Sequence, residues 1–454
     1  MKKSYLILAA AAALFAACSS DSNDPAEKQT AKNEPMAIGF DSYVGRSTTR
    51  AGMTGTMTNA DLQKAEGGFG VFAYYSDNKP YSETSIPNFM YNQKVTYTSA
   101  TGNWDYEPIK YWPNEFGDKA ISEGVDKLTF FAYAPYVAVT AGTGRVTGSE
   151  ASGIVGLTSN TTAGDPYVKY IADLDPDNRV DLCWGVANAA FSSTVTGATA
   201  NNIAIGAPYI DLVKPQTDAK IAFDFKHALA SLNVQIDADV DVSDHSHGKA
   251  LDGKTKIYVR SVSFEGFTTK GLLNLNAPAS EGPKWYELSS INTKISGGSV
   301  TIYDGRRDGK ESQAGATAPS EEPTGLNTTL TPTETTLNPV GVTNDAVNLF
   351  AADAKTAPIF VIPTGEKLKV NIVYDVETKD DNLSGYLSDG TTRGSAVENS
   401  ISQTVQISSS DVTLVAGKSY VVKLHLGMTS VKVEASVSDW GDGGTSDTDL
   451  PYNN

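Results

Sequence analysis

The chain is short of the side chains that most catalytic and metal sites use. Its 454 residues include two cysteines and four histidines, and it contains no G-x-S-x-G turn, no HExxH pair and no phosphate-binding glycine loop. Basic residues are also few, because 36 Lys and Arg against 53 Asp and Glu give a formal net charge of -17. That balance argues against a nucleic-acid partner, whose phosphates require a basic face. We therefore expect no enzymatic activity and no cofactor.

The first 17 residues have the pattern of an export signal. Lys2 and Lys3 precede a short apolar stretch, and two alanines stand directly before Cys18. The stretch is shorter than the about 20 residues that a membrane span needs, so it is typical of a secretory signal. The placement of Cys18 is similar to a bacterial lipobox, and we expect residues 1–17 to be a lipoprotein signal peptide and Cys18 to be lipidated. Residues 18–35 hold almost no large apolar side chain and are expected to form a disordered tether.

Short runs rich in Val, Ile, Tyr, Phe and Thr recur along the rest of the chain. Many alternate apolar with polar residues, and 40 glycines and 20 prolines interrupt them. This spacing predicts an all-β fold of sandwich type. Helical periodicity is scarce, and residues 59–67 and 225–232 are the two candidates for a short helix.

The length of the chain predicts two cores rather than one. We place the boundary in the polar, proline-containing stretch 211–220, which gives an N-terminal domain over residues 51–214 and a C-terminal domain over residues 215–440. Residues 305–338 are rich in Thr, Pro, Glu and Gly and are expected to form a protruding loop. Residues 441–454 are expected to be a flexible tail.

Several polar motifs carry no convincing chemistry. The aspartates of residues 173–181 begin with the spacing of a calcium loop, but the twelfth position is Trp184 instead of a bidentate Glu, so a solvated acidic turn is expected. Cys183 lies between two apolar residues and is predicted to be a buried, inert thiol without a neighbouring base. His227 and His425 also have apolar surroundings and are interpreted as structural. We expect no metal site.

Residues 36–52, MAIGFDSYVGRSTTRAG, combine a strand pattern with a loop pattern. Side chains of a strand alternate between its faces, so four apolar residues share one face: Met36, Ile38, Phe40 and Val44. The small residues that follow carry Arg46 and Arg50 and are typical of an exposed loop that a protease can cut. We expect residues 36–48 to occupy a sheet edge with the apolar face toward the core.

A set of blocks in a fixed order identifies a family. The blocks are GGFGVFAYY, FMYNQKVTYTSATGNWDYEPIKYWPNE, DKLTFFAYAPY, IAFDFKHALASLNVQI, IYVRSVSFEGFTTKGLLNL, FVIPTGEKLKVNIVYDV and VAGKSYVVKLHLGMTSVKVEASVSDW. Together they closely resemble the Bacteroidetes fimbrillin family, the major and minor pilins of type V pili. The resemblance runs with gaps from Ile38 to Trp440.

The resemblance implies a fold and a maturation route. It implies two transthyretin-like β-sandwich domains in tandem, export as a lipoprotein to the outer membrane, and an arginine-specific protease that removes residues 36–50. Cys18 matches the lipidated cysteine, and Arg50–Ala51 matches the cleaved bond, with Arg46 as the runner-up. A strand from another pilin subunit then fills the vacated groove, which produces an extracellular fimbria that supports adhesion. Removing a strand exposes unpaired backbone groups and an apolar groove, which a neighbour's strand repairs.

The last predicted strand is the candidate donor. Its apolar face consists of Val431, Val433, Ala435 and Val437. The alternative is that this segment is only the last strand of its own C-terminal domain. For the whole chain the alternative function is a monomeric, lipid-anchored adhesin or glycan-binding lipoprotein, for which Tyr111 and Trp112 are the most glycan-like residues. The sequence distinguishes neither stalk from tip nor one adhesion receptor from another.

Overall fold

The computed structural model describes thirteen stretches of the chain, and almost all of their secondary structure is strand. These stretches are residues 35–44, 57–64, 67–113, 126–147, 151–174, 178–188, 191–193, 201–215, 219–238, 254–304, 347–348, 358–387 and 391–440. The all-β prediction is therefore confirmed. Within these ranges no helix is long and apolar enough to cross a membrane. The predicted loop at 305–338 and tail at 441–454 lie outside the described residues.

One of the two predicted helices is present, as the single turn α1 (Asn59–Leu62). Thr58 and Asp61 cap its first turn reciprocally, each side chain accepting from the other's backbone N–H. The second prediction is wrong, because residues 225–232 end one strand and begin the next. Phe225, Leu229 and Leu232 are buried in three different hydrophobic clusters. Their helix-like spacing therefore arises because the chain passes three cores in succession.

An eight-stranded sheet forms most of the end of the molecule that contains β1. In order across the sheet its strands are β10 (Cys183–Ala187), β14 (Lys220–His227), β1 (Gly39–Val44), β4 (Asn103–Asp105), β3 (Met90–Thr98), β2 (Phe69–Tyr75), β5 (Leu128–Ala134) and β13 (Tyr209–Leu212). β10 pairs with β5 as well as with β14, so seven of these strands form a closed ring. The interior of the ring is one hydrophobic cluster, to which β1, β2, β5 and β14 contribute.

A seven-stranded sheet covers one outer face of this ring. Its strands are β19 (Ser290–Lys294), β18 (Lys284–Glu287), β17 (Lys270–Asn274), β9 (Tyr167–Ile171), β8 (Gly153–Leu157), β7 (Arg145–Val146) and β6 (Val139–Thr140). β2 and β5 lie between the two layers, so that alternate residues such as Phe130 and Phe131 enter different clusters. Burial on both faces explains why these strands have nearly continuous apolar sequences instead of alternating ones.

A nine-stranded sheet builds the opposite end around its own hydrophobic cluster. Its strands are β24 (Gly394–Thr404), β23 (Lys369–Lys379), β16 (Thr255–Thr268), β22 (Ile359–Pro363), β15 (Ala230–Ala238), β27 (Lys418–Leu426) and β28 (Val431–Asp439), with β20 (Gly298–Asp304) on β16 and β21 (Val347–Asn348) on β15. Two small pairs complete the described strands, β11 (Phe191–Ser193) with β12 (Asn201–Ile203) and β25 (Gln406–Ile407) with β26 (Ser410–Asp411).

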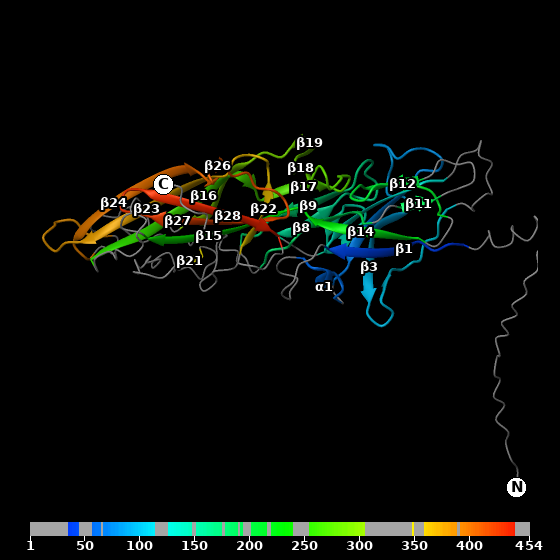
Figure 1. Cartoon of the computed structure of the whole chain (residues 1–454), viewed down its shortest axis with the longest axis horizontal. Helices are drawn as coiled ribbons and strands as arrows, with labels where there is room; N and C mark the ends of the chain where they lie inside the picture. The colour runs from blue at the N-terminus through cyan, green and yellow to red at the C-terminus, as the bar shows by residue number, and fades with distance from the viewer. Residues whose placement is uncertain are drawn as a thin grey trace, which may run out of the picture.

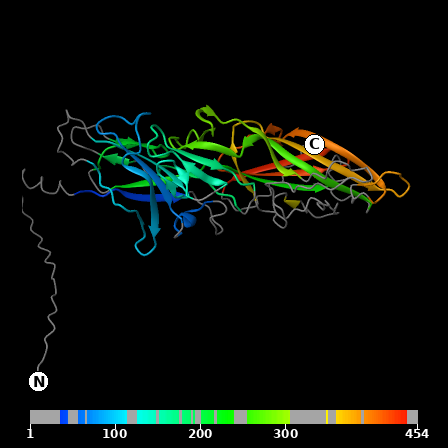
Figure 2. The same cartoon turned by 180° about the vertical axis from the view of Figure 1, so that it is seen from behind.

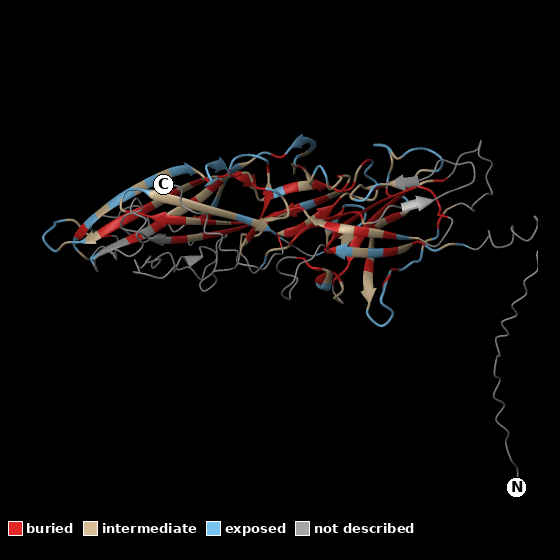
Figure 3. Cartoon of the chain, viewed as in Figure 1, coloured by how far each residue is buried: buried red, intermediate tan, exposed pale blue. Residues whose placement is uncertain are grey.

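The described strands form an elongated body with β1 near one end and β24 near the other (Figures 1 and 2). Buried residues continue along this whole length (Figure 3). The predicted boundary at residue 214 does not separate the sheets, since β14 pairs with β1, and β17 pairs with β9. The polar stretch that suggested a linker is itself partly in the core, because Val213 and Lys214 are buried. The division into the two domains stays a prediction.

Candidate functional site

β1 lies inside the sheet, not at its edge as the sequence suggested. It pairs in parallel with β14 over six residues, from Gly39 opposite Lys220 to Val44 opposite Phe225. On its other side Phe40 pairs with Trp104 of β4. The edge expectation failed because the partner strand β14 lies about 180 residues further along the chain, and local alternation carries no information about such a partner. β1 is therefore one of the strands that close the ring.

The residues just before β1 are held by a second segment. The backbone N–H of Ile38 donates to the carbonyl of Lys110 at 2.9 Å, and that of Trp112 donates to the carbonyl of Met36 at 2.9 Å. The hydroxyl of Tyr106 donates to the carbonyl of Ile38 at 2.8 Å. Both edges of the 36–44 segment thus have hydrogen-bond partners, and removing the segment would leave two facing edges unpaired.

The apolar side chains of this segment enter the interior of the ring. Ile38, Phe40 and Val44 are buried, and Met36 is half-buried against the same cluster. The ring of Phe40 lies 5.2 to 6.4 Å from four other aromatic rings, those of Phe69, Tyr106, Phe130 and Phe223. Burying side chains of this size is worth about 1.5–3 kcal/mol each. An empty β1 position would therefore be an apolar slot.

The predicted processing residues fall outside the described parts of the chain. Cys18, Arg46, Arg50 and Ala51 all lie there, and the described residues resume at Met57. The glycan-like aromatic pair is described, and it does not form an exposed platform. Tyr111 is 49% exposed, but Trp112 is buried in the ring.

β28 occupies a very different position, at the edge of the nine-stranded sheet. It pairs antiparallel with β27 over nine residues, from Val431 opposite Leu426 to Asp439 opposite Lys418. Val431, Val433 and Ala435 are partly buried against the core of that sheet, whereas Val437 is 46% exposed. In this structure β28 is thus the last strand of its own sheet.

Trp440 fixes the end of β28 to the rest of the molecule. It stacks on the imidazole of His227 with ring centroids 5.1 Å apart and planes within 2° of parallel. Its ring also lies 4.7 Å from that of Phe360. Through this buried indole, the last strand contacts β14, the direct neighbour of β1.

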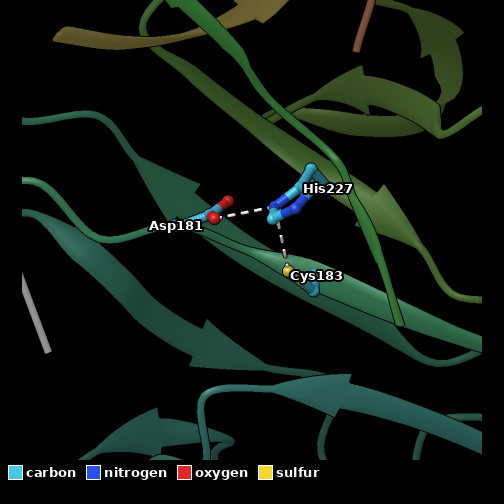
Figure 4. A group of neighbouring side chains, drawn as sticks. All are labelled: Asp181, Cys183 and His227. Atoms are coloured by element: carbon cyan, nitrogen blue, oxygen red, sulfur yellow. Dashed lines mark hydrogen bonds and ion pairs between the residues drawn. The ribbon is translucent and has the colours of Figure 1, made fainter. Parts of the chain in front are cut away.

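His227 also belongs to a largely buried polar cluster with Asp181 and Cys183 (Figure 4). His227 Nδ1 lies 2.7 Å from Asp181 Oδ2 and 3.6 Å from Cys183 Sγ. The same Asp181 oxygen accepts from the backbone N–H of Met57 at 2.7 Å. Asp181 is fully buried, so the prediction of a solvated turn is wrong for this residue. Asp173 points elsewhere and accepts from the Ser152 hydroxyl at 2.7 Å.

The cluster lacks the features of a catalytic triad. Burial lowers the pKa of His227, but the charge and hydrogen bond of Asp181 outweigh this effect and raise the pKa above its ordinary value. Burial, and then the charge of Asp181, raises the pKa of the Cys183 thiol well above its usual range. A thiol held protonated is a poor nucleophile. One and the same His227 nitrogen faces both partners, whereas a triad uses the two ring nitrogens separately.

Sequence reasoning missed this cluster, although it described each member. Cys183 and His227 are directly opposite each other in the β10–β14 ladder, and Asp181 is two residues before Cys183. Residues two apart in an extended chain point to the same face, so Asp-x-Cys was a usable pattern. The partner strand that supplies His227 was not evident, because only the ladder register brings it opposite.

The fold and the position of β1 define an all-β protein whose ring is closed by a strand from near its N-terminus. No family model matches the chain. The chain is 25% identical over 477 residues to fimbrium subunit Fim1C of Phocaeicola vulgatus, and this covers 100% of the chain and 99% of that relative. The chain thus fits the fimbrillin family, and the resemblance seen in the sequence is confirmed.

The solved structures that resemble the chain share less of its sequence. A candidate cell adhesion protein from Bacteroides uniformis is 14% identical with a TM-score of 0.36, covering 89% of this chain and 98% of that one. The tip fimbrial protein Mfa3 from Porphyromonas gingivalis, in a C-terminally truncated form, is 9% identical with a TM-score of 0.23, covering 84% of this chain and 96% of that one.

Proposed function

We propose that this chain is a structural subunit of a type V fimbria whose first strand is removed and replaced by a strand from another subunit. The full-length similarity to a fimbrium subunit supports the structural role. The main observation in favour of strand exchange is the position of β1 in the sheet. β1 has hydrogen-bond partners along both edges, and its apolar face is buried. Its removal opens a closed ring and leaves an apolar slot with two unpaired edges, which a strand of similar pattern would fill.

The maturation route follows from residues around this strand. Cys18 carries a lipid that anchors the precursor at the outer membrane, and an arginine-specific protease cuts after Arg50, with Arg46 as the alternative. Residues 45–56 connect Val44 to Met57, so cleavage between them cuts the link between β1 and the rest of the ring. The mature subunit then assembles with other pilin subunits into an extracellular fimbria that supports adhesion.

β28 is the proposed donor strand. Its alternating face of Val431, Val433, Ala435 and Val437 is comparable to that of β1, and its hydrogen bonds to the sheet lie along one edge only, on β27. For β28 to act as a donor, its hydrogen bonds to β27 and the stacking of Trp440 on His227 must both break. The contact between donor and acceptor is head-to-tail and does not close, so repetition produces a filament.

The exchange is tested with arginine variants of the full chain. Wild type, Arg46→Ala, Arg50→Ala and the double variant are treated with an arginine-specific protease, and polymers are followed by electron microscopy and N-terminal sequencing. We expect wild type to polymerise and the double variant to remain monomeric. Arg145→Ala, at an exposed position on β7, is the matched control and should polymerise normally. Polymerisation of the double variant would overturn the proposal.

The donor and the anchor need separate tests. A chain ending at Gly427 lacks β28, and we expect it to accept a strand but to block further growth. Normal filament length in that variant would place the donor elsewhere. Cys18→Ala should release the precursor from the membrane fraction, while unchanged fractionation with no lipid mass on the N-terminal peptide would exclude lipidation.

A further inference from the structure

We propose that Asp181, Cys183 and His227 form a binding site for a divalent transition metal of the zinc type. The three side chains offer one oxygen, one sulfur and one nitrogen, and these atoms all lie within 4.8 Å of one another (Figure 4). The ladder between β10 and β14 fixes Cys183 opposite His227, and Asp181 shares the face of Cys183. The proposal does not depend on the fimbrial role.

The spacing of the sulfur and nitrogen already suits such an ion. In a tetrahedral zinc site with Zn–S near 2.3 Å and Zn–N near 2.0 Å, the two ligand atoms lie about 3.5 Å apart. Cys183 Sγ and His227 Nδ1 are 3.6 Å apart. Two adjacent strands of one ladder hold these two ligands, so little rearrangement is needed to bind the ion.

An unsatisfied carboxylate oxygen supplies the independent second observation. Asp181 Oδ2 is occupied by Met57 and His227, but Oδ1 is buried and has no hydrogen-bond partner among the described residues. A buried carboxylate oxygen without a partner is costly, and a bound cation would satisfy it. Oδ1 could therefore coordinate the ion while Oδ2 keeps its bond to Met57.

The donor set decides the class of ion. Thiolate and imidazole favour zinc and cobalt, whereas calcium and magnesium prefer sites built entirely of oxygen. Binding would displace the proton of Cys183 Sγ to the buffer, and His227 would bind through Nδ1 as the neutral imidazole that carries its proton on Nε2. The His227 side chain is 12% exposed, which gives the ion a route from solvent. Water would complete the coordination.

Cobalt spectroscopy and zinc calorimetry test this site on the full chain, first freed of metal by a chelator. Titration with Co²⁺ should produce a thiolate-to-cobalt charge-transfer band at one equivalent, and Zn²⁺ should displace the Co²⁺. Zn²⁺ should also raise the midpoint of thermal unfolding, because it binds the folded ring. Absence of the charge-transfer band in wild type would overturn the proposal without reference to any variant.

Variants assign the ligands. Cys183→Ser should abolish the band, and Asp181→Asn and His227→Gln should each weaken zinc binding by at least about tenfold. Cys18→Ser and His425→Gln are matched controls that should bind as wild type does, since Cys18 is the other thiol and His425 is another buried histidine that lies beside a carboxylate. A band that survives in Cys183→Ser but not in Cys18→Ser would also overturn the proposal.

Discussion

β1 and β28 have similar alternating sequences but are held in different ways. β1 has neighbours on both edges, and its inward-facing side chains Phe40 and Val44 are buried inside a closed ring. β28 has a neighbour on one edge and packs only half-buried valines, while the indole of Trp440 fixes its end. Two strands with the same apolar–polar alternation thus differ in the contacts that must break before each can dissociate from its sheet. In the proposed exchange, β1 leaves only after the chain is cut and another strand competes for its place, whereas β28 breaks one ladder and one aromatic contact.

The largest effect is expected from Phe40→Ala on β1. Loss of a fully buried phenylalanine in a close-packed core should lower the free energy of unfolding of the precursor by about 3–5 kcal/mol. Tyr43→Ala is the control on the opposite face, where the side chain is 44% exposed, and should change it by much less. Chemical denaturation of the uncleaved chain measures both. Equal effects would mean that β1 is not anchored through its inward face.

Trp440→Ala should have the next largest effect, about 3 kcal/mol, because the indole is buried between His227 and Phe360. Hydrogen exchange should then increase along β28 while β1 keeps its protection. Trp440→Phe should restore part of the stacking and of the stability. If β28 keeps wild-type protection in Trp440→Ala, the indole is not what holds the strand.

Val433→Ala on β28 should cost about 1 kcal/mol, since the side chain is only half-buried and loses little apolar contact. Val437→Ala, further along the same face but exposed, should be close to neutral. Denaturation of both variants beside Phe40→Ala gives a direct ranking of the two strands. A loss for Val433→Ala as large as for Phe40→Ala would remove the difference between them.

The smallest effect concerns acid and the β27–β28 ladder. His425, whose Nε2 lies 3.4 Å from Glu434 Oε2, and Lys432, whose Nζ lies 2.6 Å from Oε1, hold the pKa of Glu434 well below its usual range, against the opposing effect of burial. A lowered carboxyl pKa stabilises the fold in full above the unfolded-state pKa of about 4.3, and this stability is lost gradually as the pH falls from there through the lowered folded-state pKa. The free energy of unfolding of wild type should therefore exceed that of Glu434→Gln by less than about 1 kcal/mol at neutral pH, and the gap should begin to narrow as the pH falls below about 4.

His425→Gln provides the matching test of that ion pair. It removes the group that lowers the Glu434 pKa most, so its acid dependence should resemble that of Glu434→Gln. Urea denaturation from pH 7 to pH 3 measures the difference. A gap between wild type and Glu434→Gln that stays constant over this range would show that the pair does not hold β28.

Local patterns in the sequence were sufficient for the strands but not for their partners. The apolar alternation of residues 36–44 and the turn at α1 were readable, since each depends on neighbouring residues. The wrongly predicted helix at residues 225–232 shows the limit of local patterns. Its apolar residues have helical spacing, but they are buried in three different hydrophobic clusters. The interior position of β1 depends on a parallel partner far along the chain, which no local pattern specifies.

The same limit applies to the polar cluster. Asp181 and Cys183 were visible as neighbours, but the register of β10 against β14 is what brings His227 opposite Cys183. The hydrogen bond from Met57 to Asp181 also joins residues 124 positions apart. A site whose residues lie on different strands can be predicted only when the pairing of those strands is known. That pairing depends on the packing of the whole core and not on local sequence.

Exchange at the β1 slot is measured most directly by hydrogen exchange with mass spectrometry on the protease-cleaved chain. A synthetic peptide of residues 431–440 is added, and protection is followed in β14, β4 and β27, with a peptide carrying Val433→Asp as the control. The account predicts that the added peptide displaces residues 36–50 and that the edges of β14 and β4 stay protected only while one of the two strands is present. Retention of residues 36–50 by the cleaved chain in excess peptide, with no binding of the peptide beside β14, would contradict it.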